Sequence, residues 1–280
     1  MIDCIALVVH PERQGAEKQA MIAADFYRSR GIHVFFPQKE SLDHPCDKMM
    51  IITFGGDGTL LIGARYALQY HAPLLGINLG TVGFLTEGEP DQLPEIMMRL
   101  LKDDYELEKR HLLQVRTDHE EQAFIAVNDA VITRGGFARL IRVETFVNEE
   151  FLGVYTADGM IASTPTGSTG YSLSAGGPVV APGVACTVIT PICPHSFQRP
   201  SFVVPDQATV RFHLLASRQQ SAELQIDGQH RCMLTAGSNV WITGAEETLQ
   251  LVRLRVPQFF TLSMKKLNEW SIHDERSDDH

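Results

Sequence analysis

The chain has 280 residues, of which 44% are hydrophobic, and its formal net charge at pH 7 is −10. A chain of this length can bury one large core or two modest ones, and we expect two lobes. The negative charge disfavours nucleic acid and anionic membranes as partners, because both require a basic surface. No segment reaches the ~20 apolar residues of a membrane helix and no cleavable signal is visible, so we expect a cytoplasmic protein without a membrane partner.

The cysteines predict neither a disulfide framework nor a zinc site. They are odd in number, scattered along the chain and never spaced as C-x-x-C, so we expect thiols in a reducing compartment. The five are Cys4, Cys46, Cys186, Cys193 and Cys232.

The first hundred residues alternate between apolar runs and helical patterns. This alternation predicts an α/β domain with a largely parallel sheet. We expect strands over residues 4–9, 33–36, 49–54 and 73–77, and helices over 16–30 and 90–102. His10 and Arg13, after the first strand, could contact a phosphate, but a solvated turn is the preferred interpretation.

The segment Met50–Leu61 reads MIITFGGDGTLL, in which an apolar strand breaks into a glycine-rich turn before a helix. The glycines permit backbone conformations that bulkier residues resist, and Asp57 falls at the start of the helix. A helix N-terminus attracts anions, so a carboxylate there suggests phosphoryl chemistry with a cation or a proton acceptor. An aspartate that only caps the helix remains the alternative.

Common phosphate-binding loops do not account for this turn. The chain has no G-x-x-x-x-G-K-[ST], and Gly76, Gly80 and Gly83 lack the spacing of G-x-G-x-x-G. Instead, GGDGT resembles the turn of a kinase superfamily that includes NAD kinases, diacylglycerol and sphingosine kinases, and 6-phosphofructokinases. A second glycine-rich turn, Asn78–Gly83, follows the next strand, and we expect it at the same sheet edge as Asp57.

From about residue 105 the pattern becomes β-rich, with turn signals such as Gly135-Gly136 and Asp227-Gly228 and little helical periodicity. We therefore expect an all-β second lobe. The tail after residue 257 is predicted to form a helix or an arm that packs on a lobe, through the face formed by Phe260, Met264, Leu267 and Trp270.

Residues 157–178 read ADGMIASTPTGSTGYSLSAGGP, a run dense in small hydroxyls and nearly without charge. Hydroxyls and backbone amides suit the ribose and phosphate oxygens of a nucleotide. The run resembles the STPTGSTAYSLSAGGP block of NAD kinases, and the two glycine turns, Asn128-Asp129 and TPICPH at 190–195 extend the match over most of residues 50–205. Lipid kinases and phosphofructokinases, as families, lack this block.

The resemblance implies an α/β domain over 1–106 with the GGDGT turn, a β-rich NAD-binding domain over 107–252, and a C-terminal arm over 253–280 that packs back on the first domain. It implies a nucleotide crevice between the two domains. The implied reaction is transfer of a phosphoryl group from ATP, or from polyphosphate, to the 2′-hydroxyl of the adenosine ribose of NAD. The implied cofactor is Mg²⁺ or another divalent ion held by the donor phosphates, with no metal ligand assigned, and the implied assembly is a homodimer or homotetramer.

The resemblance assigns Asp57 as the catalytic base or phosphate-orienting group, and Asn128 with Asp129 as the contacts to the ribose. Its full binding set is Asp57, Gly58, Asn128, Asp129, Asp158, Thr169, Gly170, Tyr171, Ser172, Leu173, Ser174, Ala185 and Gln229, the last two matching less securely. Gly170 replaces a common Ala, Asp129 a frequent Glu, and Thr156 a frequent basic residue. A lipid or sugar kinase that shares only GGDGT, or a non-catalytic NAD(P)-binding module, is the alternative.

Overall fold

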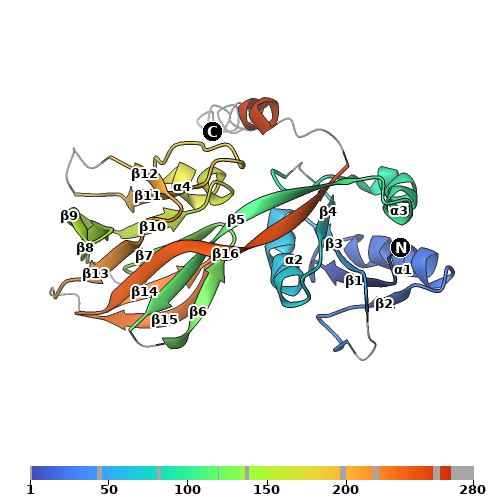
Figure 1. Ribbon diagram of the computed structural model, residues 1–280, viewed down its shortest axis with the longest axis horizontal. Helices are drawn as coiled ribbons and strands as arrows, with labels where there is room; N and C mark the ends of the chain where they lie inside the picture. The colour runs from blue at the N-terminus through green and yellow to red at the C-terminus, as the bar shows by residue number, and fades with distance from the viewer. Residues whose placement is uncertain are drawn as a thin grey trace, which may run out of the picture. The chain divides into compact units, whose positions relative to one another are not determined.

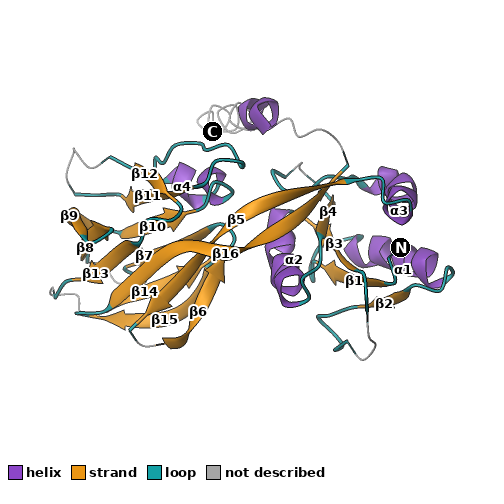
Figure 2. Ribbon diagram, in the orientation of Figure 1, coloured by secondary structure: helices purple, strands orange, loops and turns teal. Residues whose placement is uncertain are grey.

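The computed structural model describes residues 2–42, 46–80, 83–118, 120–135, 139–195, 200–216, 221–254 and 259–265. The chain divides into two compact units: unit 1 comprises Met1–Lys109 with Leu249–His280, and unit 2 comprises Arg110–Thr248. Figures 1 and 2 label their helices and strands.

Unit 1 is built on a parallel sheet with the strand order β2-β1-β3-β4. Its strands are β1 (Cys4–Val9), β2 (His33–Phe35), β3 (Met49–Gly55) and β4 (Leu74–Asn78). Its helices are α1 (Ala16–Arg28), α2 (Asp57–Gln69) and α3 (Leu93–Leu101), the last preceded by the short 3-10 helix η1 (Pro90–Gln92). Leu251, near the end of the chain, pairs in parallel with Leu74. The predicted α/β domain with a largely parallel sheet is confirmed.

The buried faces of unit 1 follow from the residue pattern. Residues 4–8 of β1 are buried, as expected for a central strand flanked on both sides. Helix α1 buries four alanines and Tyr27 at helical spacing against this sheet. The helix ends at Arg28, and Gly31 adopts φ +76°, a left-handed conformation that glycine takes at little cost. The chain then turns back into β2.

Unit 2 contains two antiparallel sheets, as the β-rich pattern predicted. One has the order β12-β11-β10-β7-β14-β15, and the other includes β16-β13-β8-β9 with β5 and β6 paired beside it. The strands are β5 (Glu106–Thr117), β6 (Glu120–Ala126), β7 (Asp129–Thr133), β8 (Ile141–Val147), β9 (Glu150–Ala157), β10 (Gly159–Ser163), β11 (Cys186–Ile192), β12 (Phe202–Pro205), β13 (Val210–Leu214), β14 (Ser221–Ile226), β15 (Gln229–Thr235) and β16 (Asn239–Arg253).

One core joins the two sheets of unit 2. It combines residues such as Ile132 and Ala162 from the first sheet with Val143, Phe212 and Val240 from the second. Alternating burial along β13 and β14 is typical of strands with one face on such a core. The helical segments η2 (Gly167–Thr169) and α4 (Tyr171–Ser174) are short and fall within the hydroxyl-rich run.

The prediction that the chain has no disulfide was wrong. Cys4, in β1, is bonded to Cys46, and their Cα atoms lie 5.8 Å apart although 42 residues separate them in sequence. Spacing along the chain did not reveal this pair because the loop before β3 folds back on the start of β1. The free cysteines among the described residues are Cys186, Cys193 and Cys232.

The C-terminal tail is described only in part. Residues 259–265 are helical, and the side chains of Phe260 and Met264 are exposed. Leu267 and Trp270 lie outside the described residues, so the packing of this face stays a prediction. No helix in the described ranges combines the length and the apolar character that a membrane crossing needs.

Candidate active site

Asp57 is the first residue of α2, and backbone amides hold its carboxylate. The amide of Phe84 donates to Oδ2 at 2.8 Å, and the amide of Leu85 donates to Oδ1 at 3.2 Å. Gly56 precedes the helix without a side-chain cap. Asp57 therefore does not merely cap its own helix, because its two oxygens bind a segment 27 and 28 residues further along the chain.

The second glycine-rich turn is fitted to this carboxylate. A Cβ atom at Gly83 would overlap the carboxylate of Asp57, so only glycine allows so close an approach. The amide of Gly83 donates to Oγ1 of Thr86 at 3.2 Å, and the side-chain amide of Asn78 donates to the Gly80 carbonyl at 2.8 Å. The two turns meet at the carboxyl ends of β3 and β4, as expected for adjacent parallel strands.

Gly58 is exposed in the first turn of α2, and a Cβ atom there would meet no atom within 4 Å. The backbone at this position is therefore open to a ligand. Gly55 differs, because a Cβ atom there would overlap the side chain of Thr59. The first glycine of the motif serves packing, and Gly58 leaves space.

In unit 2, Asn128 and Asp129 stand at the start of β7, and Asp227 organises their backbone. The Asp227 carboxylate accepts hydrogen bonds from the amides of Val127 at 3.0 Å, Asn128 at 2.7 Å and Asp129 at 3.2 Å. The amide of Asp227 in turn donates to the Asp129 carbonyl at 3.0 Å. This reciprocal contact fixes the loop that carries the predicted ribose-binding pair.

Among the described residues, the backbone amides of Asn128 and Asp129 have hydrogen-bond partners, whereas their side chains differ. Oδ1 of Asn128 is buried and accepts no hydrogen bond within the described part of the chain. Asp129 is 5% exposed, and burial, followed by the neighbouring charge of Asp227, raises the pKa of its carboxyl group to about 7. The protonated form of the Asp129 carboxyl is therefore favoured at higher pH than in an exposed aspartate.

The hydroxyl-rich run is mostly folded into the protein, which differs from the interpretation of its hydroxyls as nucleotide contacts. The hydroxyl of Thr164 donates to the Val127 carbonyl at 2.7 Å and accepts from the Gly167 amide at 3.0 Å. The hydroxyl of Ser168 donates to the Pro165 carbonyl at 2.7 Å. These side chains build the loop, because the backbone polar groups of a buried turn need partners.

The same loop lies against Asn128, the first residue of the predicted ribose-binding pair. A Cβ atom at Gly167 would overlap the backbone of Asn128, and the amide of Thr164 donates to the Asn128 carbonyl at 2.8 Å. The sequence predicted both segments as site elements without indicating this contact. The structure brings residues 127–129 and 164–167 together.

Tyr171, Asp158 and Asp129 belong to one region of unit 2. The pKa of the Tyr171 hydroxyl is raised, first by burial and then by the nearby Cys193, Asp158 and Asp129. Asp158 forms an ion pair with Arg134, so its charge is balanced within unit 2. Tyr171 is 46% exposed, and its ring is therefore open to a planar ligand.

The remaining predicted residues differ in accessibility. Ser172 is fully buried, and its Oγ lies 2.9 Å from Oγ1 of Thr190, so its side chain supports the loop from inside. Thr169 is nearly buried, and its hydroxyl donates to the Thr166 carbonyl at 3.3 Å. Ala185 and Ser174 are exposed, and Gly170, Leu173 and Gln229 are partly exposed.

Sequence reasoning missed the role of Asp227. The Asp-Gly turn signal was recognised, but nothing local indicated that its carboxylate binds amides 98 to 100 residues earlier in the chain. Asp227 adopts φ +50°, which an aspartate in a tight turn tolerates better than most residues.

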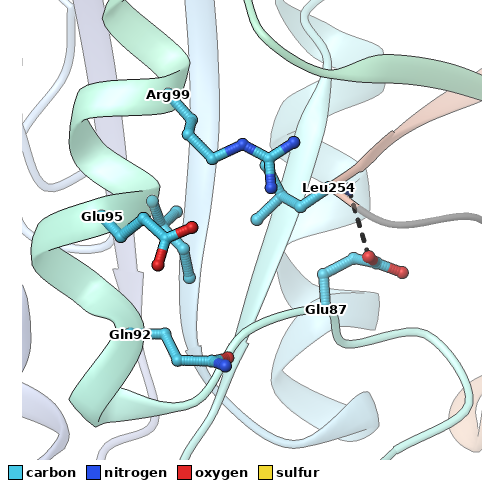
Figure 3. Close-up of a pocket in the computed structure, with 6 residues that line it drawn as sticks. Glu87, Gln92, Glu95, Arg99 and Leu254 are labelled. Atoms are coloured by element: carbon cyan, nitrogen blue, oxygen red, sulfur yellow. Dashed lines mark hydrogen bonds between the residues drawn. The ribbon is translucent and has the colours of Figure 1, made fainter.

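Two pockets lie away from these residues. One, in unit 1, is lined by Glu87 and Leu254 and by residues of η1 and α3, and Figure 3 shows Gln92, Glu95 and Arg99 along one side of it. The other, in unit 2, is lined by Gln114, Arg116, Trp241 and Thr243. Neither contains a residue that the sequence assigned to the site.

A glycine-rich turn at the end of a parallel strand, with a carboxylate that two amides fix, is the arrangement expected of a nucleotide-dependent phosphotransferase. Family models agree: residues 38–105 match the ATP-NAD kinase N-terminal domain, and residues 127–254 match the ATP-NAD kinase C-terminal domain. NAD kinase of Heliobacterium modesticaldum is 38% identical over 239 residues, covering 84% of each chain. NAD kinase of Moorella thermoacetica is 35% identical over 278 residues, covering 95% of this chain and 89% of its own. The chain belongs to the NAD kinase family.

Solved structures share the fold. Yeast NADH kinase complexed with NADH matches with a TM-score of 0.83 at 22% identity, covering 96% of this chain and 88% of its own. An NAD kinase from Archaeoglobus fulgidus in complex with ATP matches with a TM-score of 0.69 at 24% identity, covering 95% and 98%. These likenesses establish the two-domain architecture.

Proposed function

We propose that this chain transfers the terminal phosphoryl group of ATP to the 2′-hydroxyl of the adenosine ribose of NAD and so produces NADP. The observation that carries the proposal is the Asn128-Asp129 pair. Both side chains are at least partly buried, and Oδ1 of Asn128 accepts no hydrogen bond in the described part of the chain. A buried acceptor without a donor is costly, and ribose hydroxyls supply donors.

The two aspartates would have different tasks. The 2′-oxygen attacks the terminal phosphorus, the bond to the bridging oxygen of ATP breaks, and the hydroxyl proton passes to a carboxylate. We assign proton acceptance to Asp57, whose orientation two amides fix. The pKa of the Asp129 carboxyl is raised to about 7. The group can therefore donate a hydrogen bond to a ribose hydroxyl when protonated and accept one when ionised. Phosphoryl transfer depends mainly on such positioning.

Mg²⁺ is the ion that we propose, carried by the donor phosphates. The group of three possible metal ligands found among the described residues is Asp3, Cys4 and Cys46, and its sulfur atoms are unsuited to this ion. Mg²⁺ is usually bound through substrate phosphates with few protein ligands, and since Asp57 is assigned to proton acceptance, the donor phosphates would hold the ion. When bound, the ion would neutralise charge on the phosphates.

The further details of this proposal rest on the family. The yeast NADH kinase structure contains NADH and the Archaeoglobus fulgidus NAD kinase structure contains ATP, which supports nucleotide substrates here. A homo-oligomeric assembly and a cytoplasmic location are likewise proposed by analogy. Polyphosphate remains the alternative donor to be compared with ATP.

The test is a turnover assay with NAD, ATP and Mg²⁺ that measures NADP by mass spectrometry. We expect NADP to form, and we expect 2′-deoxy-NAD, which lacks the acceptor hydroxyl, to be inert. ATP consumption without NADP would contradict the proposal. Phosphorylation of 2′-deoxy-NAD would place the chemistry at another oxygen.

A further inference from the structure

The side chain of Arg13 lies against the two glycine turns that surround Asp57. A Cβ atom at Gly80 would overlap the Arg13 guanidinium, and a Cβ atom at Gly56 would lie 3.3 Å from its Nη1. Gly56 directly precedes α2, and Gly80 follows β4. The guanidinium therefore occupies the space that these glycines leave open, beside the first turn of α2.

Within the described part of the chain, Arg13 carries its charge there without an acidic partner. Among the described residues, no carboxylate lies within 4.0 Å of its nitrogens, and the Arg13 side chain is only partly exposed. No ion pair joins Asp57 to Arg13 among the described residues, and the Asp57 oxygens accept from the amides of Phe84 and Leu85. A helix N-terminus also bears partial positive charge. The Arg13 guanidinium and the N-terminus of α2 thus lie close together, and a bound anion would stabilise both.

The chemistry of this place fits a phosphate chain. A guanidinium binds phosphate oxygens through two parallel N–H donors, and the amides of a helix N-terminus point at the same anion. Gly58, in the first turn of α2, leaves the approach open. The chain has no P-loop lysine that would supply this charge.

We propose that Arg13 binds the phosphate chain of the phosphoryl donor and positions it beside Asp57. The proposal rests on the proposed function, since it names a residue for the donor of that reaction. Residue 13 lies outside both stretches that the family models match, and the sequence interpretation preferred a solvated turn there. The guanidinium against Gly56 and Gly80 carries the inference.

The first test compares Arg13→Gln with wild type in steady-state kinetics. A lost charge-assisted contact should raise the KM for ATP about tenfold or more and leave the KM for NAD unchanged. Arg13→Lys keeps the charge but loses the two-donor geometry, so its KM for ATP should fall between those of Arg13→Gln and wild type. Lys18→Gln is the matched control, because Lys18 is an exposed cation of α1 in the same unit.

A second test moves the guanidinium without changing it. Gly80→Ala adds the methyl group that overlaps Arg13, so it should also raise the KM for ATP. In an Arg13→Gln background the same substitution should add little. Additive effects of the two changes would contradict a shared mechanism, and Gly80→Ala alone decides the matter if Arg13→Gln does not fold.

Binding measurements separate this proposal from the proposed function. Calorimetric titration with inorganic tripolyphosphate needs no turnover, and Arg13→Gln should weaken its binding about tenfold or more relative to wild type and Lys18→Gln. Equal affinity of all three proteins would overturn the role of Arg13, as would an increase in KM for NAD alone. Absence of NADP formation by wild type would instead overturn the proposed function.

Discussion

Asp57 in unit 1 and Asp129 in unit 2 are held in opposite ways. The Asp57 carboxylate accepts two backbone amides and stands in a partly exposed turn. The Asp129 carboxyl is buried and has no hydrogen-bond donor in the described ranges, because Asp227 takes the three amides of its loop. Amide donors fix a carboxylate in place, whereas burial beside a like charge favours its protonated form.

This difference suggests that Asp57 and Asp129 have different functions. A carboxylate fixed by amides is suited to meeting a reacting atom at a defined position. A carboxyl group with a raised pKa can donate a hydrogen bond when protonated and accept one when ionised. It is therefore suited to binding hydroxyls, which both donate and accept. We therefore propose that an aspartate serves chemistry in unit 1 and recognition in unit 2, and that the surrounding donors determine which.

Asp57→Asn tests whether Asp57 acts in turnover rather than in NAD binding, and it has the largest expected effect. We expect turnover to fall by about 10²–10⁴-fold, the span of a positioned acid–base group, while NAD binding stays largely intact. Asp91→Asn is the matched control, since Asp91 is an exposed acid in the short helix η1 of the same unit. Steady-state kinetics and NAD titration measure both effects. Equal losses in affinity and turnover would make Asp57 a binding residue.

The buried state of Asp129 can be tested through stability. Its pKa is raised from 3.8 to about 7 in the folded protein, so the native state binds more protons than the unfolded state within this pH window. Relative to Asp129→Asn, the wild-type free energy of unfolding should fall as pH rises from about 4 to about 7, by up to ~1.4 kcal/mol per pH unit, and stay level above it. Urea unfolding across pH measures this difference. A difference that does not vary with pH would show that Asp129 titrates normally.

The recognition role of Asp129 is tested by Asp129→Ala. Removal of the ribose contact should raise the KM for NAD about tenfold, the equivalent of ~1.4 kcal/mol, with little change in the KM for ATP. Glu150→Ala is the matched control, since Glu150 is an exposed acid of β9 in the same unit. A raised KM for ATP with an unchanged KM for NAD would remove Asp129 from the acceptor site.

The smallest expected effect concerns product release. Thr156 stands in β9, at a position where the family resemblance leads us to expect a basic residue, so we expect a phosphate on the product ribose to lack one partner. Thr156→Arg should tighten NADP binding by up to about tenfold, with a smaller effect on NAD. Calorimetric titration of both dinucleotides measures the selectivity. An equal gain for both would show that residue 156 does not face the product phosphate.

The local elements and the class of chemistry could be predicted from the amino-acid sequence. Residues 4–9 were predicted as a strand with the observed bounds, and the helix predicted over 16–30 ends at Arg28. Apolar periodicity, glycine turns and β-rich patterning extend over only a few residues each, so they can be recognised in the sequence before the fold is known. The GGDGT turn and the run 157–178 identified the family for the same reason, since each is a contiguous motif.

The partners of individual side chains, in contrast, became known only from the folded structure. Asp227 binds amides about 100 residues away, and Cys4 is bonded to Cys46. The hydroxyl of Thr164 turned inward to its loop, and Arg13 came to rest against Gly80. These outcomes depend on which donors and charges the folded chain brings within a few ångströms of each other, and on how much water burial removes. Neither quantity is a property of a short stretch of sequence.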